Sequence, residues 1–234
     1  MAIKTRGLGL RIWRILKRVF IFLFIFQLFY ILLLKWVDPP FTLTQLGSLI
    51  TGKGLKRDYV DIKQMSPYAR LAVICSEDQL FPDHNGFDWK HIEKAMKNNE
   101  KRPNRIKGAS TISQQVAKNV FLWQGRSWFR KGLEVYFTFM IELIWGKKRI
   151  LEMYLNVAEM GKGVFGIEAA AQAYFKKPAL KLTRQEAAMI AASLPNPKEY
   201  TVKPVSRYVA WKYPWVLRQM NNLQDDDDIQ KLIQ

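Results

Sequence analysis

Hydrophobic residues form one long run near the start of the chain. Residues 19–37 read VFIFLFIFQLFYILLLKWV, and Gln27 is the only strongly polar position before Lys35. As an α-helix this run is about 28 Å long, close to the hydrocarbon thickness of a bilayer. Lys35 can extend its charge toward the interface, where Trp36 is also favoured. The pattern predicts a transmembrane helix over residues 19–37.

A buried core helix and a cleaved signal peptide are the alternatives to an anchor. A signal peptide has a shorter apolar run and ends in small residues of the A-x-A type. This run ends in KWVDPPFT, which contains no such site, so we favour an uncleaved anchor. The preceding residues carry no acid and six basic side chains, which are Lys4, Arg6, Arg11, Arg14, Lys17 and Arg18. That bias predicts a cytoplasmic N-terminus, with the remaining chain on the periplasmic side of an inner membrane.

Beyond the anchor, apolar positions recur at helical spacing, and residues 60–220 contain no sustained alternation. This pattern predicts a mainly α domain. Ser66 and Pro67 are typical of a helix start, and Pro82 would end that helix. A helix apolar on nearly all sides, residues 128–145, is expected at the centre of the domain. The other expected helices cover residues 88–99, 112–122, 148–160, 165–175, 183–193 and 205–220.

The expected organisation has five parts. A basic tail (1–18) and the anchor (19–37) precede a weakly structured, membrane-proximal linker (38–65). One substantial domain (66–222) follows, and a frayed acidic tail (223–234) comes last. Within the domain, residues 98–110 read NNEKRPNRIKGAS and predict a mobile basic loop.

The chain is strongly basic, with 37 Lys and Arg against 20 Asp and Glu and a net charge of +17. Without the six N-terminal cations, 31 basic and 20 acidic residues remain, a net +11 on the exported part. Nucleic acid is excluded as a partner on that side of the membrane, whereas a phosphate-bearing lipid fits. The single cysteine, Cys75, excludes an intramolecular disulfide, and the absence of Cys and His clusters argues against a metal cage.

Two carboxylates interrupt apolar helical sequence and are the candidate catalytic groups. Glu134 lies in RKGLEVYFTFMIE, with Arg130 and Lys131 on the same helical face. Glu77 follows the apolar stretch LAVICS at the end of a helix. Non-catalytic roles are also compatible with the sequence: Glu134 could form a structural ion pair, and Glu77 could be an exposed acid at a helix end. If both face one cleft, they fit sugar chemistry.

A polar string, KGASTISQQVAKN, surrounds a predicted helix start at residues 107–119. Helix N-termini bind anions, so these side chains could hold a phosphate or sugar hydroxyls, although a solvated helix start has the same composition. Thr111 and Gln114 have capping-box spacing. The candidate residues are Lys107, Ser110, Thr111, Gln114, Gln115, Lys118 and Asn119.

Five motifs in order resemble glycosyltransferase family 51, the monofunctional biosynthetic peptidoglycan transglycosylases, a family related to the glycosyltransferase module of class A penicillin-binding proteins. They are EDQLFPDHNG, GASTISQQVAKN, RKGLE, ILEMYLNVAEMGKGVFGIEAAAQAYF and LTRQEAAMIAASLPNP. The resemblance covers roughly residues 60–220. Glu159 and Met160 depart mildly from the fourth motif. No S-x-x-K motif of a transpeptidase is present, as the monofunctional form implies.

The resemblance implies a lysozyme-like, bilobal helical domain that polymerises lipid II. The growing strand, linked to undecaprenyl pyrophosphate, is the donor, and the 4-hydroxyl of incoming lipid II is the acceptor. The implied product is a β-1,4-linked glycan strand, with release of undecaprenyl pyrophosphate. Whether Mg²⁺ or Mn²⁺ accompanies the pyrophosphate, and whether other cell-wall synthesis or division proteins bind, is left open by the sequence.

The resemblance also implies roles for individual residues. Glu77 would be the general base on the acceptor hydroxyl. Glu134, with Arg130 and Lys131, would lie on the donor side near the pyrophosphate. Lys118 and the 107–119 string would bind the donor. The residues expected to support the cleft without reacting are Asp78, Phe81, His84, Gly86 and Asn156.

Two other function classes remain compatible with parts of the sequence. A lysozyme-like lytic transglycosylase or muramidase would share the helical fold and the carboxylates, but it would not need cations beside Glu134. A non-catalytic scaffold that binds lipid II would not need every motif carboxylate, and all of them are present. We therefore expect a synthase.

Overall fold

The computed structural model describes residues 3–101, 108–125 and 127–234. The predicted basic loop falls largely at 102–107, outside the described residues, as does Lys107. The chain forms two compact units, Met1–Asp38 and Pro39–Gln234, and each is considered separately.

The first unit is one helix, α1 (Ile3–Leu33). Its segment Gly9–Leu33 has 25 residues and a mean hydropathy of 2.1, so it is long and apolar enough to cross a membrane. The helix begins earlier than the predicted anchor and ends before Lys35, which lies in a turn with its Nζ 5.5 Å from the Trp36 ring centroid.

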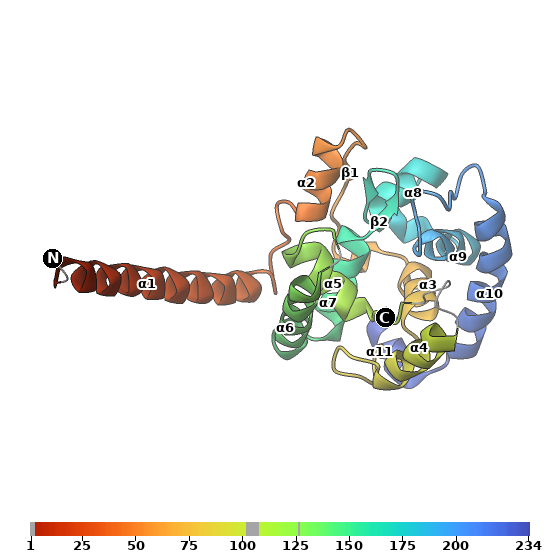
Figure 1. Ribbon diagram of the computed structural model, residues 1–234. Helices are drawn as coiled ribbons and strands as arrows, with labels where there is room; N and C mark the ends of the chain where they lie inside the picture. The colour runs from red at the N-terminus through yellow and green to blue at the C-terminus, as the bar shows by residue number, and fades with distance from the viewer. Residues whose placement is uncertain (1–2, 102–107, 126) are drawn as a thin grey trace. The chain divides into compact units, whose positions relative to one another are not determined.

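The second unit is mainly helical, which confirms the predicted fold class (Figure 1). Two short 3₁₀ turns, Ile62–Gln64 and Ala179–Lys181, supplement the α-helices. The helices of this unit are α2 (Leu43–Ile50), α3 (Pro67–Glu77), α4 (Trp89–Lys101), α5 (Ile112–Phe121), α6 (Trp128–Ile144), α7 (Lys147–Val157), α8 (Ile167–Phe175), α9 (Arg184–Ser193), α10 (Arg207–Leu223) and α11 (Asp227–Ile233).

Capping side chains start several of these helices, and those of α3 and α5 are the ones predicted. The Ser66 hydroxyl accepts a hydrogen bond from the N–H of Tyr68, and Pro67 occupies the first helical position of α3. Thr111 forms a capping box with Gln114 at the start of α5. Ser127 caps α6 and Thr183 caps α9. Each cap satisfies backbone donors that a helix start otherwise leaves unpaired.

Two groups of packed helices make up the unit. In one, α3 packs against α9, α10 and α11, and in the other α5 packs against α2, α6 and α7. Figure 1 shows the second group on one side of α3 and the α9–α10 pair on the other. The C-terminal end of α3 faces α5, so chemistry placed at this end lies between the two groups.

A small three-stranded sheet was not expected from the sequence. β1 (Lys56–Arg57) pairs in parallel with β3 (Val164–Phe165), which pairs antiparallel with β2 (Glu159–Gly161). The helix predicted to reach residue 160 ends at Val157, and the chain then enters β2. Strands of two or three residues are too short to show a period-2 pattern.

Two segments are more ordered than predicted. The stretch expected to be a weakly structured linker contains α2, whose start is a capping box of Thr42 and Gln45. The acidic tail forms α11, with Asp226 as N-cap and Ile229 and Ile233 buried. The prediction of a frayed tail is wrong because these apolar residues pack onto α3.

Helix α6 is not central, contrary to the prediction. Its buried residues are Glu134, Thr138 and Ile141, whereas Trp128 is 92% exposed and Phe129 is 72% exposed. The same outer face presents Phe139 and Leu143. An apolar sequence on all sides predicts burial in a soluble protein, but here one apolar side is directed outward.

Candidate active site

Glu77 is the last residue of α3 and is half-buried between the two helix groups. Its Oε2 accepts a hydrogen bond of 2.9 Å from Nε2 of Gln115 on α5. Burial raises the pKa of Glu77, while Gln115, Lys212 and Ser76 oppose the shift and Asp78 adds to it. A carboxylate with a raised pKa is a better proton acceptor than an ordinary surface acid.

Glu134 sits inside a cluster of cations. It is 3% exposed. Arg130 Nη1 donates to its Oε2 at 2.9 Å, and Lys131 Nζ forms an ion pair with its Oε1. Both predicted partners from the preceding helical turn are therefore confirmed as its contacts. A carboxylate this deeply buried would be costly without such pairing.

Lys118 on α5 lies close enough to both carboxylates to be affected by each. Burial lowers the pKa of Lys118, and Glu134 and Glu77 oppose that shift, whereas Arg130 and Lys131 add to it. Arg130 and Lys131 therefore contact Glu134 directly, and the charges of both cations and of both carboxylates act on Lys118.

One guanidinium nitrogen in this cluster remains available. Arg130 Nε is buried and has no hydrogen-bond partner among the described residues. Since Glu134 binds Nη1, the charge of Arg130 is only partly satisfied. A buried donor without a partner is a candidate contact for an anionic ligand.

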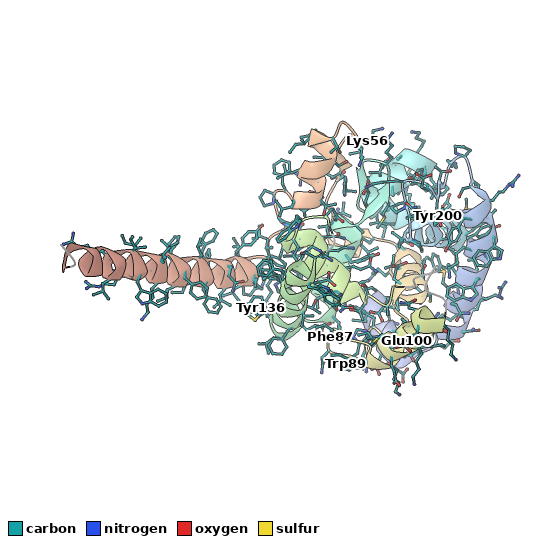
Figure 2. All side chains as sticks on the ribbon, viewed as in Figure 1. Lys56, Phe87, Trp89, Glu100, Tyr136 and Tyr200 are labelled. Atoms are coloured by element: carbon teal, nitrogen blue, oxygen red, sulfur yellow. The ribbon has the colours of Figure 1, made fainter. Side chains whose placement is uncertain are left out.

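Sequence reasoning missed the contribution of α10. Lys212 and Tyr208, one helical turn apart on α10, both experience the charge of Glu77, which opposes the burial-driven lowering of the Lys212 pKa and helps raise the pKa of Tyr208. Tyr208 stacks on Tyr200 at 3.8 Å between ring centroids; Tyr200 is among the residues labelled in Figure 2. Farther along, Gln219 accepts a hydrogen bond from Gln79 at 3.3 Å. The sequence feature that could have indicated this is the four-residue spacing of Tyr208 and Lys212, which places both side chains on one face of a helix.

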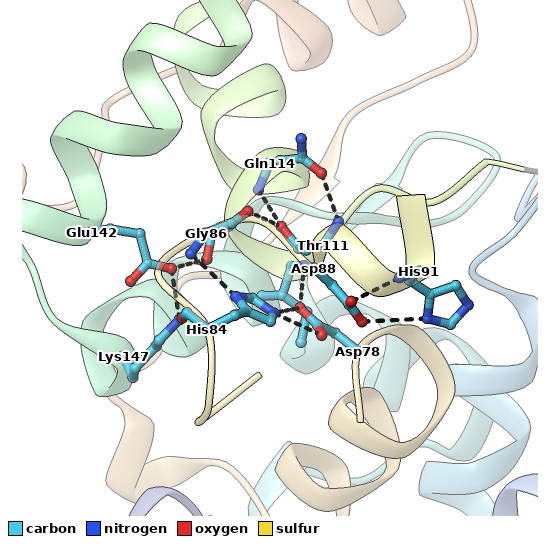
Figure 3. Close-up of polar contacts among 11 residues, drawn as sticks. Asp78, His84, Gly86, Asp88, His91, Thr111, Gln114, Glu142 and Lys147 are labelled. Carbon is cyan, nitrogen blue, oxygen red and sulfur yellow. Dashed lines mark hydrogen bonds and ion pairs between the residues drawn. The ribbon is translucent and has the colours of Figure 1, made fainter. Parts of the chain in front are cut away.

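The loop after Glu77 is held by a buried acid (Figure 3). Asp78 accepts hydrogen bonds from His84 Nε2 at 3.0 Å and from the N–H of Ile112 at 3.0 Å. His84 Nδ1 accepts from the N–H of Gly86 at 3.1 Å, which assigns the ring proton to Nε2. The predicted supporting pair therefore connects the loop to the start of α5.

A second, half-buried ion pair that contacts this loop was not predicted. Glu142 on α6 accepts from Ser113 and forms an ion pair with Lys147 at 2.7 Å (Figure 3). Lys147 Nζ also donates to the backbone oxygen of His84 and lies 4.6 Å from the ring centroid of Phe81. The sequence feature that could have indicated this pair is Glu142, an acid within the apolar stretch FTFMIELIW.

Gly86 has a conformation and surroundings that require glycine. Its φ is +89°, and an added Cβ would lie 2.7 Å from Thr138 Cγ2. The Gly86 carbonyl accepts from the Thr111 hydroxyl at 2.7 Å. Just after Gly86, the Phe87 and Trp89 rings stack at 5.6 Å between centroids where the loop enters α4 (Figure 2).

The remaining predicted residues have varied surroundings. Ser110 is exposed, and Asn119 is half-buried one residue after Lys118. The Thr111 hydroxyl is occupied by Gly86 and by the capping box. Asn156 is fully buried and pairs with the backbone of Val60 through both side-chain atoms, at 3.0 and 3.1 Å, so its contacts are structural.

No group of three or more His, Cys, Asp or Glu side chains is arranged to hold a metal ion within residues 3–101, 108–125 and 127–234.

Comparison with known proteins gives consistent matches. The transglycosylase family model matches residues 44–221. A biosynthetic peptidoglycan transglycosylase of Shigella boydii serotype 4 is 59% identical over 174 residues, which cover 74% of this chain and 72% of that protein. The protein of the same description from Escherichia coli strain Crooks has the same identity and coverage.

A relative from another organism gives a similar match. A biosynthetic peptidoglycan transglycosylase of Mannheimia succiniciproducens is 59% identical over 166 residues, covering 71% of this chain and 68% of that protein. The matched family segment includes α3, α5, α6 and all but the last two residues of α10, which carry the site described above.

Proposed function

The chain belongs to the transglycosylase family and is a biosynthetic peptidoglycan transglycosylase that polymerises lipid II into glycan strands, and we propose that Glu77 is its general base. The main support for this proposal is the position of Glu77 between the helix groups, where its pKa is raised and Gln115 donates a hydrogen bond to it. In this role Oε1 or Oε2 accepts the proton of the acceptor 4-hydroxyl as its oxygen attacks the donor anomeric carbon.

The cationic cluster around Glu134 is the proposed donor side. Lys118, Arg130 and Lys131 would neutralise the pyrophosphate as its bond to the anomeric carbon breaks. The partnerless Arg130 Nε supports this assignment because it offers a donor in a desolvated site. Pyrophosphate is already a good leaving group, so charge stabilisation suffices and no strong general acid is needed.

Glu134 would hold these cations in place instead of transferring a proton. Glu134 forms ion pairs with Arg130 and Lys131. Without the Glu134 carboxylate, these two cations would repel each other and Lys118. Attack from the Glu77 side opposite the leaving pyrophosphate inverts the anomeric configuration, which gives a β linkage from an α-linked donor.

The catalytic unit is proposed to rest on the periplasmic surface of the inner membrane, with the N-terminus cytoplasmic. The basic residues that precede the apolar segment support the orientation. Exposed apolar side chains also occur on α6 (Trp128, Phe129, Phe139, Leu143) and on α2 (Leu43, Leu49, Ile50). These faces would enter the headgroup region, where the lipid-linked substrate is found.

Polymerisation of labelled lipid II by the full-length protein in detergent tests the assignment of Glu77. The wild type should make a polymer that muramidase digests, and Glu77→Gln should make none while keeping the circular dichroism spectrum of the wild type. Glu100→Gln, an exposed acid on α4, is the matched control and should polymerise normally. Full polymerisation by Glu77→Gln would refute the proposed base.

A further inference from the structure

A cavity of about 220 Å³ lies beside the proposed donor site. One wall is a single face of α4, formed by Ile92, Ala95, Met96 and Asn99 at helical spacing. Ala109 and Ser110 form the next wall, and Gln114 and Lys131 complete the lining. Lys131 is the link to catalysis because its Nζ is paired with Glu134.

The Gln114 amide in this lining is half satisfied. Its Oε1 accepts the N–H of Thr111 at 3.0 Å, which fixes the orientation of the amide. The residue is only 3% exposed, yet its Nε2 donates no hydrogen bond to any residue that the structure describes. Figure 3 shows this nitrogen directed away from Thr111. An N–H₂ group on a nearly buried residue that lines the cavity and has no acceptor among the described residues is free to donate to a carbonyl oxygen of a ligand.

The lining combines an apolar wall with polar groups, and this restricts the ligand. An isoprenoid chain would leave Gln114 Nε2 without an acceptor, which is unfavourable. A bare phosphate would lie against the apolar face of α4. A short amide bearing a methyl group satisfies both parts, since its oxygen accepts from Gln114 while its methyl packs against Ile92, Ala95 and Met96.

We propose that this cavity is a subsite for a methyl-bearing amide of the donor sugar next to the pyrophosphate. The proposal rests on the donor assignment above, because it requires the pyrophosphate to lie at Lys131. Two groups of that sugar have the required chemistry: the 2-acetamido group and the amide of the 3-lactyl-peptide stem. In either case the cavity fixes the donor sugar relative to the attacking hydroxyl and contributes to binding rather than to proton transfer.

Equilibrium binding of a donor with a blocked terminal 4-hydroxyl and a fluorescent lipid tests the subsite in the full-length protein. Ala95→Leu fills the cavity, and Gln114→Glu removes the N–H₂ group while keeping the oxygen that caps α5. Each should weaken donor binding about tenfold. The loss should appear mainly as a higher donor concentration for half-maximal transfer, with a smaller fall in the transfer rate at saturating donor. Lys94→Leu, on the exposed opposite face of α4, is the matched control and should bind normally.

Two modified donors identify the group that binds. One carries a 2-hydroxyl in place of the 2-acetamido group, and the other a 3-hydroxyl in place of the lactyl-peptide. The wild type should bind one of them about tenfold more weakly, and the two variants should lose nothing further with that donor. Unchanged binding by both variants, or equal loss with all three donors, would overturn the subsite.

Lys118→Met separates failure of the subsite from failure of the donor assignment. If Lys118→Met binds the native donor as tightly as the wild type, the pyrophosphate is not at the cationic cluster, and both proposals fall. If Lys118→Met weakens binding but Ala95→Leu and Gln114→Glu do not, only the subsite is wrong.

Discussion

The Gln115 side chain donates a 2.9 Å hydrogen bond to Glu77 Oε2 and so joins α5 to the end of α3. Lys118 follows Gln115 by one helical turn, and the charges of Glu77 and Glu134 both raise its pKa against the effect of burial. Helix α5 therefore carries the groups that connect the proposed base to the proposed donor side. Its rigid spacing fixes the separation of the two sides more firmly than a loop would.

The acid limb of the pH–rate profile should move when Lys212 is changed. Burial raises the pKa of Glu77, while Lys212 and Gln115 lower it. Activity requires the carboxylate, so kcat/KM should rise with pH through the pKa of Glu77. Lys212→Met removes a cation that favours the carboxylate, and the acid limb should shift to higher pH.

The other charged groups near Glu77 stay in place in this experiment. They are Asp78 on the following loop and Lys118 on α5, with Tyr154 and Tyr208 as neutral neighbours. Lys181→Met, at an exposed position, is the control for loss of one positive charge. A limb that stays fixed in Lys212→Met, or moves to lower pH, contradicts the role given to Lys212.

Asp78→Asn should destabilise the catalytic unit. The carboxylate accepts from His84 and from the N–H of Ile112 in a buried position, and an amide can replace only part of this. We expect a loss of about 2–4 kcal/mol in the free energy of unfolding, measured by urea denaturation. Asp83→Asn, an exposed position on the same loop, should change it by less than about 0.5 kcal/mol.

Two glycine substitutions should change stability in opposite directions. Gly86→Ala places a methyl 2.7 Å from Thr138 Cγ2 at a φ of +89°, so the free energy of unfolding should fall by about 2 kcal/mol or more. Gly132 lies in α6 with no atom within 4 Å of an added Cβ. Gly132→Ala should raise stability by about 0.5–1 kcal/mol. Thermal unfolding of both variants checks the sign, and similar losses in both would contradict the geometry.

Spin labels should find the outer face of α6 within lipid. The one native cysteine, Cys75, is buried, and burial raises the pKa of its thiol to about 12, so it should not compete for labelling. Labels at Phe139→Cys and Ile50→Cys in nanodiscs should collide with oxygen more than with a water-soluble nickel complex. A label at Leu180→Cys, also exposed, should show the reverse. Water-like accessibility at Phe139 would exclude the proposed membrane contact.

The sequence predicted the parts of this molecule that depend on local chemistry. Caps such as Ser66 and Thr111 are visible because a hydroxyl satisfies backbone donors within three residues. The Arg130–Glu134 pair is visible because helical geometry alone brings residues four apart together.

Features made by distant segments were less accessible. The Glu142–Lys147 pair beneath the His84 loop and the approach of Lys212 to Glu77 depend on how separate elements pack. The exposed position of α6 was mispredicted because an apolar pattern does not distinguish a protein core from a lipid-facing surface.

Single-turnover transfer with prebound donor is the most direct test of Glu77 as the base. The blocked donor is bound first, acceptor lipid II is then added, and the rate of formation of the new β-1,4 bond is measured. Glu77→Gln should bind the donor within about twofold of wild type but transfer it about 10²–10⁴-fold more slowly. Weakened donor binding with an unchanged transfer rate would instead place Glu77 in the donor site and contradict its role as base.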